Sequence, residues 1–253
     1  MRSLFLLALT GLVGAFSAPS VRPPAPAPIA ALPFHVGERL TYKAHVSFIH
    51  AGDASMSIED AEDIRGHPTY HSILDVHGHV LWFHVNDHSE SWFDPTTMIA
   101  YRQVQHVDES RYNADRVYDF YPARRVYVRN GQEGQSVADP IDEDTFIYFL
   151  RTIPLEIGKT YTFNRYYHLD RNPIVLTVER REHVKVPAGE FDALVVKPII
   201  KSRGLFSASR ETEVWISDDS ARTIVRLRSK LPVGSLSLDL EHAEYASASD
   251  KLP

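Results

Sequence analysis

The segment YHSILDVHGHVLWFHVNDHSE, residues 70–90, holds five of the thirteen histidines of the chain. Histidine is the commonest protein ligand for metal ions and a frequent general base. Alternate side chains of a strand share a face, and successive residues rise about 3.3 Å. His77 and His79 would then lie on one face, about 7 Å apart, where a metal ion could bridge them. His84 and His88 would be about 13 Å apart, too far to bind one ion.

A zinc site requires three or four protein or solvent ligands. His77, His79 and Asp75 could supply three of them if a neighbouring strand adds another. The alternative is a row of polar histidines on the solvent face of a sheet, without a metal ion. Clustered histidines could also sense pH near 6. The His77/His79 face is therefore the candidate for metal binding or for a hydrolase, and both interpretations stay open.

Motifs of the common enzyme classes are absent from the sequence. It contains no G-x-S-x-G, no P-loop, no G-x-G-x-x-G and no H-E-x-x-H. Asp218 and Asp219 are adjacent and follow a predicted strand, so they indicate an acidic turn better than the two opposed carboxylates of a glycosidase. The sequence indicates no cofactor, and it favours a non-catalytic protein over an enzyme.

Apolar and polar residues alternate along most of the chain, which predicts half-buried strands. Near the N-terminus, Leu40, Tyr42, Ala44, Val46 and Phe48 fall on one face of such a strand. About a dozen segments of this kind follow one another with short connections, as in an antiparallel sheet. We expect an all-β fold, curved into a barrel-like or sandwich architecture.

One segment, residues 142–153, has helical spacing of its apolar residues instead. Asp142 is suited to cap its N-terminus, and Pro154 would end it. We expect this short helix to plug the sheet. A half-buried arginine needs a carboxylate or carbonyl partner. We therefore expect Arg151 to pair with an acidic turn residue and so to hold the helix against the sheet. The alternative is that Arg151 contacts a ligand.

Aromatic residues could line an apolar groove on a sheet of this kind, although core packing is the other fate open to them. The candidates for such ligand binding are Trp82, Phe83, Tyr118, Phe120 and Tyr121.

The N-terminus predicts export. Residues 1–17 have the basic start, apolar run and small-residue cleavage site of a signal peptide. We expect a Pro/Ala-rich linker at 18–33, a single β-rich domain at 34–246 and a disordered tail at 247–253. No later segment is long and apolar enough to span a membrane. The chain has no cysteine, which excludes disulfides and a lipid-anchor cysteine.

The charge argues against nucleic-acid binding. The chain has 27 basic and 33 acidic residues, a net charge of −6, whereas binding to phosphates requires a basic surface.

Four phrases, PFHVGERLTYKAHVSFIHAGDASMSI, DTFIYFLRTIPLEIGKTYTF, VKVPAGEFDALVVKP and VWISDDSARTIVRLRSKLPVGSLSLDL, follow one another in this order. Together they resemble the bacterial exported family known as domain of unknown function 3108, over nearly the whole chain after the linker. The resemblance implies an exported, β-rich, single-domain protein without an assigned activity. Its marks are mostly residues that shape turns and bulges: Gly37, Glu38, Gly52, Leu150, Arg151, Gly158, Gly189, Trp215, Asp218, Asp219 and Gly234.

Three functions are therefore expected. The first is an exported, non-catalytic protein of the envelope, periplasmic or secreted, that binds an apolar ligand such as a lipid or a partner protein. The second is a hydrolase or metal-binding protein that uses the His77/His79 face. The third is an adaptor in envelope assembly that pairs with a partner through an exposed strand edge.

Overall fold

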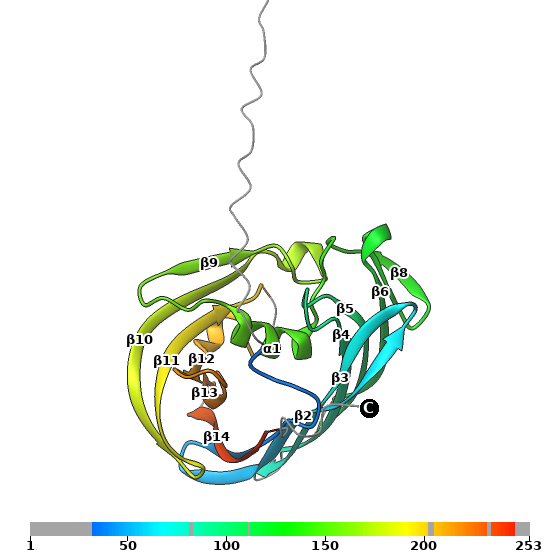
Figure 1. The fold of residues 1–253 in the computed structure, drawn as a ribbon. Helices are drawn as coiled ribbons and strands as arrows, with labels where there is room; N and C mark the ends of the chain where they lie inside the picture. The colour runs from blue at the N-terminus through cyan, green and yellow to red at the C-terminus, as the bar shows by residue number, and fades with distance from the viewer. Residues whose placement is uncertain (1–31, 81–82, 111, 202–204, 232–233, 246–253) are drawn as a thin grey trace, which may run out of the picture.

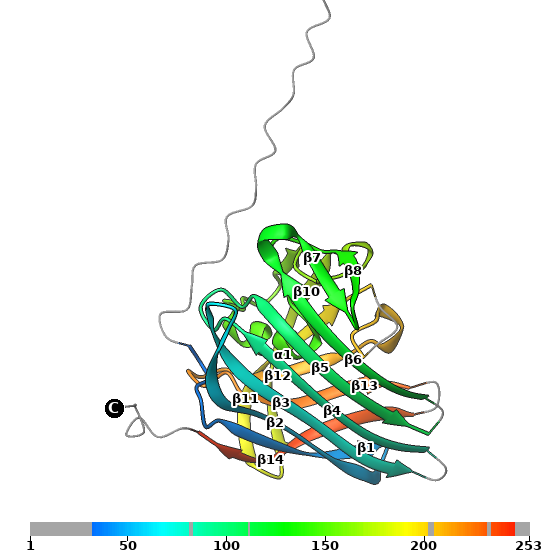
Figure 2. The ribbon, with the colours of Figure 1, turned by 90° about the vertical axis from the view of Figure 1, so that its right-hand side faces the viewer.

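Fourteen strands form one antiparallel sheet that curves around a single α-helix, α1 (Glu143–Thr152), in the described part of the chain (Figures 1 and 2). The structure is a computed structural model, and it describes residues 32–80, 83–110, 112–201, 205–231 and 234–245. The strands are β1 (Arg39–Val46), β2 (Ile49–Ile64), β3 (His67–Val80), β4 (Phe83–Phe93), β5 (Ala100–Glu109), β6 (Tyr112–Tyr121), β7 (Val126–Arg129), β8 (Gln132–Gln135), β9 (Thr160–Phe163), β10 (Ile174–Val186), β11 (Gly189–Ile199), β12 (Glu213–Ser217), β13 (Ile224–Lys230) and β14 (Ser235–Glu244). Three short 3-10 helices, η1 (Pro122–Arg124), η2 (Leu169–Arg171) and η3 (Ala208–Arg210), lie in the connections.

The strand order is β8-β7-β6-β5-β4-β3-β2-β1-β14-β13-β12-β11-β10-β9. Each half of the chain is a meander, and the pairing of β1 with β14 joins the halves. The sheet does not close, because β8 and β9 are its two edges. The predicted antiparallel all-β fold is confirmed. Of the two expected architectures the chain adopts the barrel-like one, since a single curved sheet replaces the two facing sheets of a sandwich.

Residues 1–31 and 246–253 lie outside the described residues, so the expected signal peptide, most of the linker and the expected tail are not described. In the part of the chain that is described, no helix has the length and apolar character needed to cross a membrane.

Alternation sets which side chains of a strand face the interior. In β1, Leu40, Tyr42 and Ala44 are buried, as predicted, and the Tyr42 hydroxyl donates to the Ile224 carbonyl at 3.0 Å. The prediction is wrong for Phe48, whose side chain is 90% exposed. The reason is that β1 ends at Val46 and a turn follows, so alternation no longer applies.

Helix α1 begins and ends where the sequence predicts. The carboxylate of Asp142 accepts a hydrogen bond from the Thr145 amide at 2.7 Å, which caps the helix. The helix ends at Thr152, two residues before Pro154.

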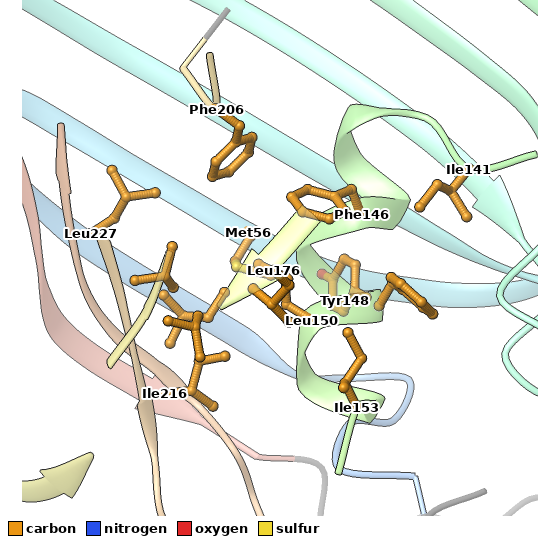
Figure 3. Packing of buried hydrophobic residues seen from close by; sticks show 14 of the residues in the cluster. Met56, Ile141, Phe146, Tyr148, Leu150, Ile153, Leu176, Phe206, Ile216 and Leu227 are labelled. Carbon is orange, nitrogen blue, oxygen red and sulfur yellow. The ribbon is translucent and has the colours of Figure 1, made fainter. Parts of the chain in front are cut away.

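Helix α1 fills one end of the interior and forms the centre of the core. Figure 3 shows its side chains Phe146 and Leu150 among labelled residues of β2, β10, β12 and β13. The ring of Phe146 packs edge-on against Phe206, with ring centroids 5.1 Å apart. Burial of apolar area against the sheet stabilises so short a helix, because helices of this length are marginal alone. The labelled strand residues in this cluster are Met56, Leu176, Ile216 and Leu227.

Arg151 anchors the C-terminal end of α1. Its guanidinium is 0% exposed and donates to both carboxylate oxygens of Glu38, at 2.5 and 2.8 Å. It also donates to the carbonyls of Pro33, Ala221 and Arg222 at 2.9 to 3.1 Å. The expected anchoring arginine is found, and its carboxylate partner is Glu38, whose amide donates to the His35 carbonyl at 3.0 Å and so closes the turn before β1.

Gly52 lies where β2 and β3 approach most closely. Its φ is +145°, and a Cβ added there would lie 2.0 Å from the His77 carbonyl oxygen. We expect Gly52→Ala to lower the free energy of unfolding by about 2 kcal/mol, from backbone strain and from this overlap. Chemical denaturation measures the effect. Gly66→Ala is the matched control, because Gly66 has a φ of +84° and open space around it; an equal loss in both variants would contradict the close approach.

Candidate functional site

Five apolar side chains on the inner face of the sheet are incompletely buried. Val46, Leu74, Val76, Leu236 and Leu238 face inward on β1, β3 and β14, yet all five are only half-buried. Val46, Leu236 and Leu238 lie towards the end of the sheet where the Ser47 amide donates to the Ser235 carbonyl at 2.7 Å. Leu74 and Val76 lie further along the sheet, opposite Met56 and Ala54 of β2. We call these five residues the apolar strip.

Small residues lie opposite two members of the apolar strip. In the register of the sheet, Val76 lies opposite Ala54, and Leu238 lies opposite Ala44. Between them, Ala44 pairs with Gly52. Ala44 and Gly52 are therefore short neighbours of Leu238, whereas the row that contains Ala54 and Val76 also contains Tyr42.

Polar side chains face the interior on β4, β5 and β6. The Asp87 carboxylate accepts a hydrogen bond from the Asp108 amide at 2.9 Å, and the Arg116 guanidinium donates to the Gln105 side chain at 3.1 Å. Partial burial raises the pKa of Asp87 and of Glu109. The inner face of the sheet is thus apolar at these positions of β1, β3 and β14 and polar at these positions of β4 to β6.

Two buried carboxylates lie at the N-terminus of α1. Asp142 accepts from the Ser91 hydroxyl at 2.7 Å, and Asp144 accepts from Gln103 at 3.2 Å and from the Ser89 hydroxyl. Burial raises the pKa of Asp142 well above its ordinary value and that of Asp144 to about 6. Both side chains are almost fully buried, so they hold the helix in place and are not accessible to a substrate.

The expected aromatic groove residues do not share one surface. Tyr118 and Phe120 are buried in the core. Tyr121, the next residue of β6, lies on the other face, where the guanidiniums of Arg65 and Arg124 lie 4.7 and 5.5 Å from its ring centroid.

Two other groove candidates lie outside what the structure describes. This holds for Trp82 and for the side chain of Phe83, whose backbone begins β4.

The structure does not bring His77, His79 and Asp75 together as a ligand set. They do share the outer face of β3, as alternation predicts. However, the His77 ring hydrogen-bonds Asn86 at 2.6 Å, and Asp75 pairs with His88 at 2.7 Å. Among the described residues, no carboxylate oxygen lies within 4.0 Å of a ring nitrogen of His77 or His79. We therefore do not propose this face as a metal or hydrolase site.

The outer face near His77 also lacks the chemistry for an apolar ligand. A shallow depression there is lined by charged side chains, among them Arg39, Lys43, Asp53 and Glu241. A second depression, at the edge of β6 and β7, is lined by Asp115, Arg116 and Arg129 and by three further, uncharged residues.

The longest free strand edge is charged. Strand β9 pairs with β10 only along Ile174–Thr177, and in the described part of the chain no strand covers the rest of that edge. The uncovered part, residues 179–186, carries Glu179, Arg180, Arg181, Glu182 and Lys185. Charged edges disfavour pairing with another strand, so this edge does not support the adaptor hypothesis.

The residues that carry the family resemblance shape turns or pin the helix. Asp219 accepts from the amides of Ala221 and Arg222 at 3.0 Å each and so builds the β12–β13 turn. Asp218 forms an ion pair with Arg181. Trp215 is buried in the core. The glycines of this set that have a positive φ are Gly37, Gly52, Gly158, Gly189 and Gly234.

Sequence reasoning missed the apolar strip, although alternation on β3 could have placed Leu74 and Val76 on the inner face. Their partial exposure could not be read from the sequence, because it depends on how far α1 extends along the interior. The buried Asp144 was also missed, since an acidic residue in the first turn of a helix is usually exposed.

A family model described as a protein of unknown function (DUF3108) matches residues 41–241 of the chain. A search of the curated proteins gives no match.

Among solved structures, the chain is similar to a β-barrel-like protein of the domain of unknown function DUF1849 from Brucella abortus. The two are 9% identical with a TM-score of 0.51, over 85% of this chain and 100% of that chain. At this identity the likeness shows the fold alone, and it agrees with the barrel-like sheet.

Two further structures match at lower TM-scores. One is a candidate lipoprotein from Parabacteroides distasonis, with 10% identity and a TM-score of 0.34 over 84% of this chain and 98% of that chain. The other is a candidate exported protein with a YmcC-like fold from Bacteroides fragilis, with 12% identity and a TM-score of 0.32 over 84% of this chain and 98% of that chain.

Proposed function

We propose that this chain, which belongs to the DUF3108 family of proteins of unknown function, is an exported, non-catalytic protein of the envelope. We also propose that it binds an apolar ligand. The ligand class is a single acyl chain, as in a lipid, and it lies along the apolar strip. The export part of this proposal rests on the signal-peptide pattern of residues 1–17.

The observation that carries the proposal is the incomplete burial of inward-facing apolar side chains. Next to α1 the interior is closely packed, with Leu40 and Leu240 at 0% exposed. Further along the same strands, Val46 and Leu238 are only half-buried although they face the same interior. Burying such apolar area gains about 25 cal/mol per Å², so an apolar chain laid there would be bound by the hydrophobic effect.

The polar part of the inner face fits an amphiphile better than a hydrocarbon. Asp87, Gln105 and Arg116 face the same interior from β4 to β6. An acyl chain on the apolar strip would leave its polar group near these side chains and near solvent. Binding sites of this kind combine an apolar lining with a few polar groups that fix orientation.

Native mass spectrometry of protein purified from the periplasm of an expressing bacterium tests the proposal directly. We expect a bound species with the mass of a lipid or fatty acid, released on unfolding. Repeatedly ligand-free spectra, together with no binding of an added fatty acid, would contradict it. Recovery of a stoichiometric partner protein instead would favour an interaction module.

A pair of neighbouring residues on β3 offers a sharper test. Val76 belongs to the apolar strip, whereas Ile73 points to the outer face of the same strand. We expect Val76→Asp to weaken the binding of a dansyl-labelled fatty acid at least tenfold, because it places a charge beside the bound chain. Fluorescence titration measures the affinity.

Ile73→Asp is the control for this pair. It introduces the same charge on the same strand and should leave the affinity unchanged. Circular dichroism should show that both variants are folded. Equal affinities of the two variants would place the ligand elsewhere or nowhere on this protein.

A further inference from the structure

The outer face of β2–β4 carries one histidine that is surrounded by carboxylates. The His71 Nδ1 atom lies 3.4 Å from an Asp60 oxygen and 3.8 Å from Glu62 Oε1. One ligand atom from each of these three residues lies within 4.8 Å of the other two. In a tetrahedral zinc site with bonds of about 2.0–2.1 Å, neighbouring ligand atoms are about 3.4 Å apart. The three side chains therefore have close to the spacing that one ion requires.

The His71 ring is held in one orientation. It stacks on the indole of Trp92 with centroids 4.3 Å apart and planes 4° from parallel. Its Nε2 hydrogen-bonds Glu90 Oε2 at 2.7 Å. Because a carboxylate accepts, Nε2 is the donor of this bond, and Nδ1 is the nitrogen that faces the other two carboxylates and would bind a metal ion. A histidine ligand whose second nitrogen donates to a carboxylate is the usual arrangement at zinc sites, because it fixes the tautomer and raises the basicity of the ligand.

The carboxylates around this ring are also oriented. The Trp92 indole N–H donates to Glu62 Oε2 at 2.9 Å, which leaves Oε1 directed at His71. Glu90 in turn contacts His88 Nε2 at 3.3 Å through its other oxygen. Two of the three candidate ligands are thus positioned by side chains outside the set.

The local strand geometry brings Asp60 and Glu62 to this face. The register shifts between Ile58 and Asp60, which marks a β-bulge, and Asp60 then lies opposite His71. Bulges re-aim side chains in this way and are frequent next to functional sites. The Asp60 and Glu62 side chains are 53% and 43% exposed, so solvent can supply a fourth ligand and an ion can enter.

We propose that Asp60, Glu62 and His71 form a binding site for a divalent transition-metal ion of the zinc class, with a fourth position open to solvent. Nitrogen and carboxylate ligands suit this class in a chain that has no cysteine. The proposal does not rest on the proposed ligand function, because the site lies on the opposite face of the sheet.

Isothermal calorimetry with zinc chloride on the purified, chelator-treated chain tests the site. We expect one equivalent of zinc to bind at pH 7 and His71→Gln to weaken its binding at least tenfold. Asp60→Asn should also weaken it, and Glu90→Gln should weaken it about tenfold through the orientation of His71. His77→Gln is the matched control, since this histidine lies on the same strand and face, but among the described residues no carboxylate oxygen lies within 4.0 Å of its ring nitrogens; zinc binding should be unchanged.

Two results would overturn the proposal: the absence of zinc binding by the wild-type chain, or equal binding by the His71→Gln and Asp60→Asn variants. Circular dichroism checks that the variants fold. If His71→Gln does not fold, the zinc affinity of Asp60→Asn tests the site instead, because the exposed Asp60 side chain is not part of the core.

Discussion

Arg151→Met is expected to lower the free energy of unfolding by about 3–5 kcal/mol. The substitution leaves the carboxylate of Glu38 buried without its counter-ion, and removing one partner of a buried ion pair costs this much. It also removes the donors to three backbone carbonyls at the junction of α1, the segment before β1 and the β12–β13 turn. For a domain of this size the loss corresponds to a fall of the melting temperature by about 10 °C.

A double-mutant cycle isolates the ion pair. Glu38→Leu combined with Arg151→Met removes both charges, so the double variant should be more stable than the sum of the single losses predicts. Arg180→Met is the matched control, because Arg180 also pairs with glutamates but is 42% exposed; we expect a loss below about 1 kcal/mol. Similar losses for Arg151→Met and Arg180→Met would contradict the anchoring role of Arg151.

The second large effect is a fall in stability as pH rises, caused by Asp144. Burial raises the pKa of this carboxyl to about 6 in the folded chain, above the ordinary value of 3.8 in the unfolded chain. A raised pKa means that the stabilising contribution is complete below pH 4 and is lost as pH rises through 6. The difference corresponds to about 3 kcal/mol in total, of which roughly half falls between pH 5 and pH 7.5.

Other titratable groups also change the dependence of the folding stability on pH, each in a known direction. The raised pKa of Asp142, which burial causes, adds to the loss of stability as pH rises. The pKa of His88 is raised by its hydrogen bond to Asp75, which adds a further loss above pH 6.5. Lys43 lowers the pKa of Asp53, so that interaction is lost only at strongly acidic pH.

Asp144→Asn tests the assignment, because the amide is neutral at every pH. The Gln103 Nε2 atom donates to the Asp144 carboxylate at 3.2 Å, and the amide oxygen of an asparagine can accept the same hydrogen bond. We expect the variant to be more stable than wild type at pH 7.5, by up to about 3 kcal/mol, and the two to converge towards pH 4. Urea denaturation at several pH values measures this.

Glu156→Gln is the control for this experiment, since the Glu156 side chain is 59% exposed and pairs with Lys159 rather than with a histidine. We expect this variant to keep the pH dependence of wild type. A wild-type stability that is flat or rises from pH 5 to pH 7.5 would show that Asp144 is not a significant buried acid.

Local turn chemistry could have predicted more of the site on β2–β4 than the histidine spacing did. Arg65 and Gly66 both have a positive φ, as a two-residue hairpin turn requires. Counting back from that turn pairs Asp60 with His71. The close spacing of His77 and His79 predicted no such contact correctly, since among the described residues no carboxylate oxygen lies within 4.0 Å of their ring nitrogens. Spacing within one strand says which face a residue occupies, while the neighbouring strand decides what it contacts.

The sequence by itself determined the antiparallel β fold, the capped helix at 142–153 and the burial of Arg151 with a partner. Period-two alternation, the cap residue Asp142 and the following proline act locally, so they can be read without knowing the fold. Only the tertiary structure decided that the partner is Glu38, 113 positions away. It also decided that α1 fills one end of the interior and leaves the apolar strip half-buried, because both facts depend on contacts between segments that are distant in the chain.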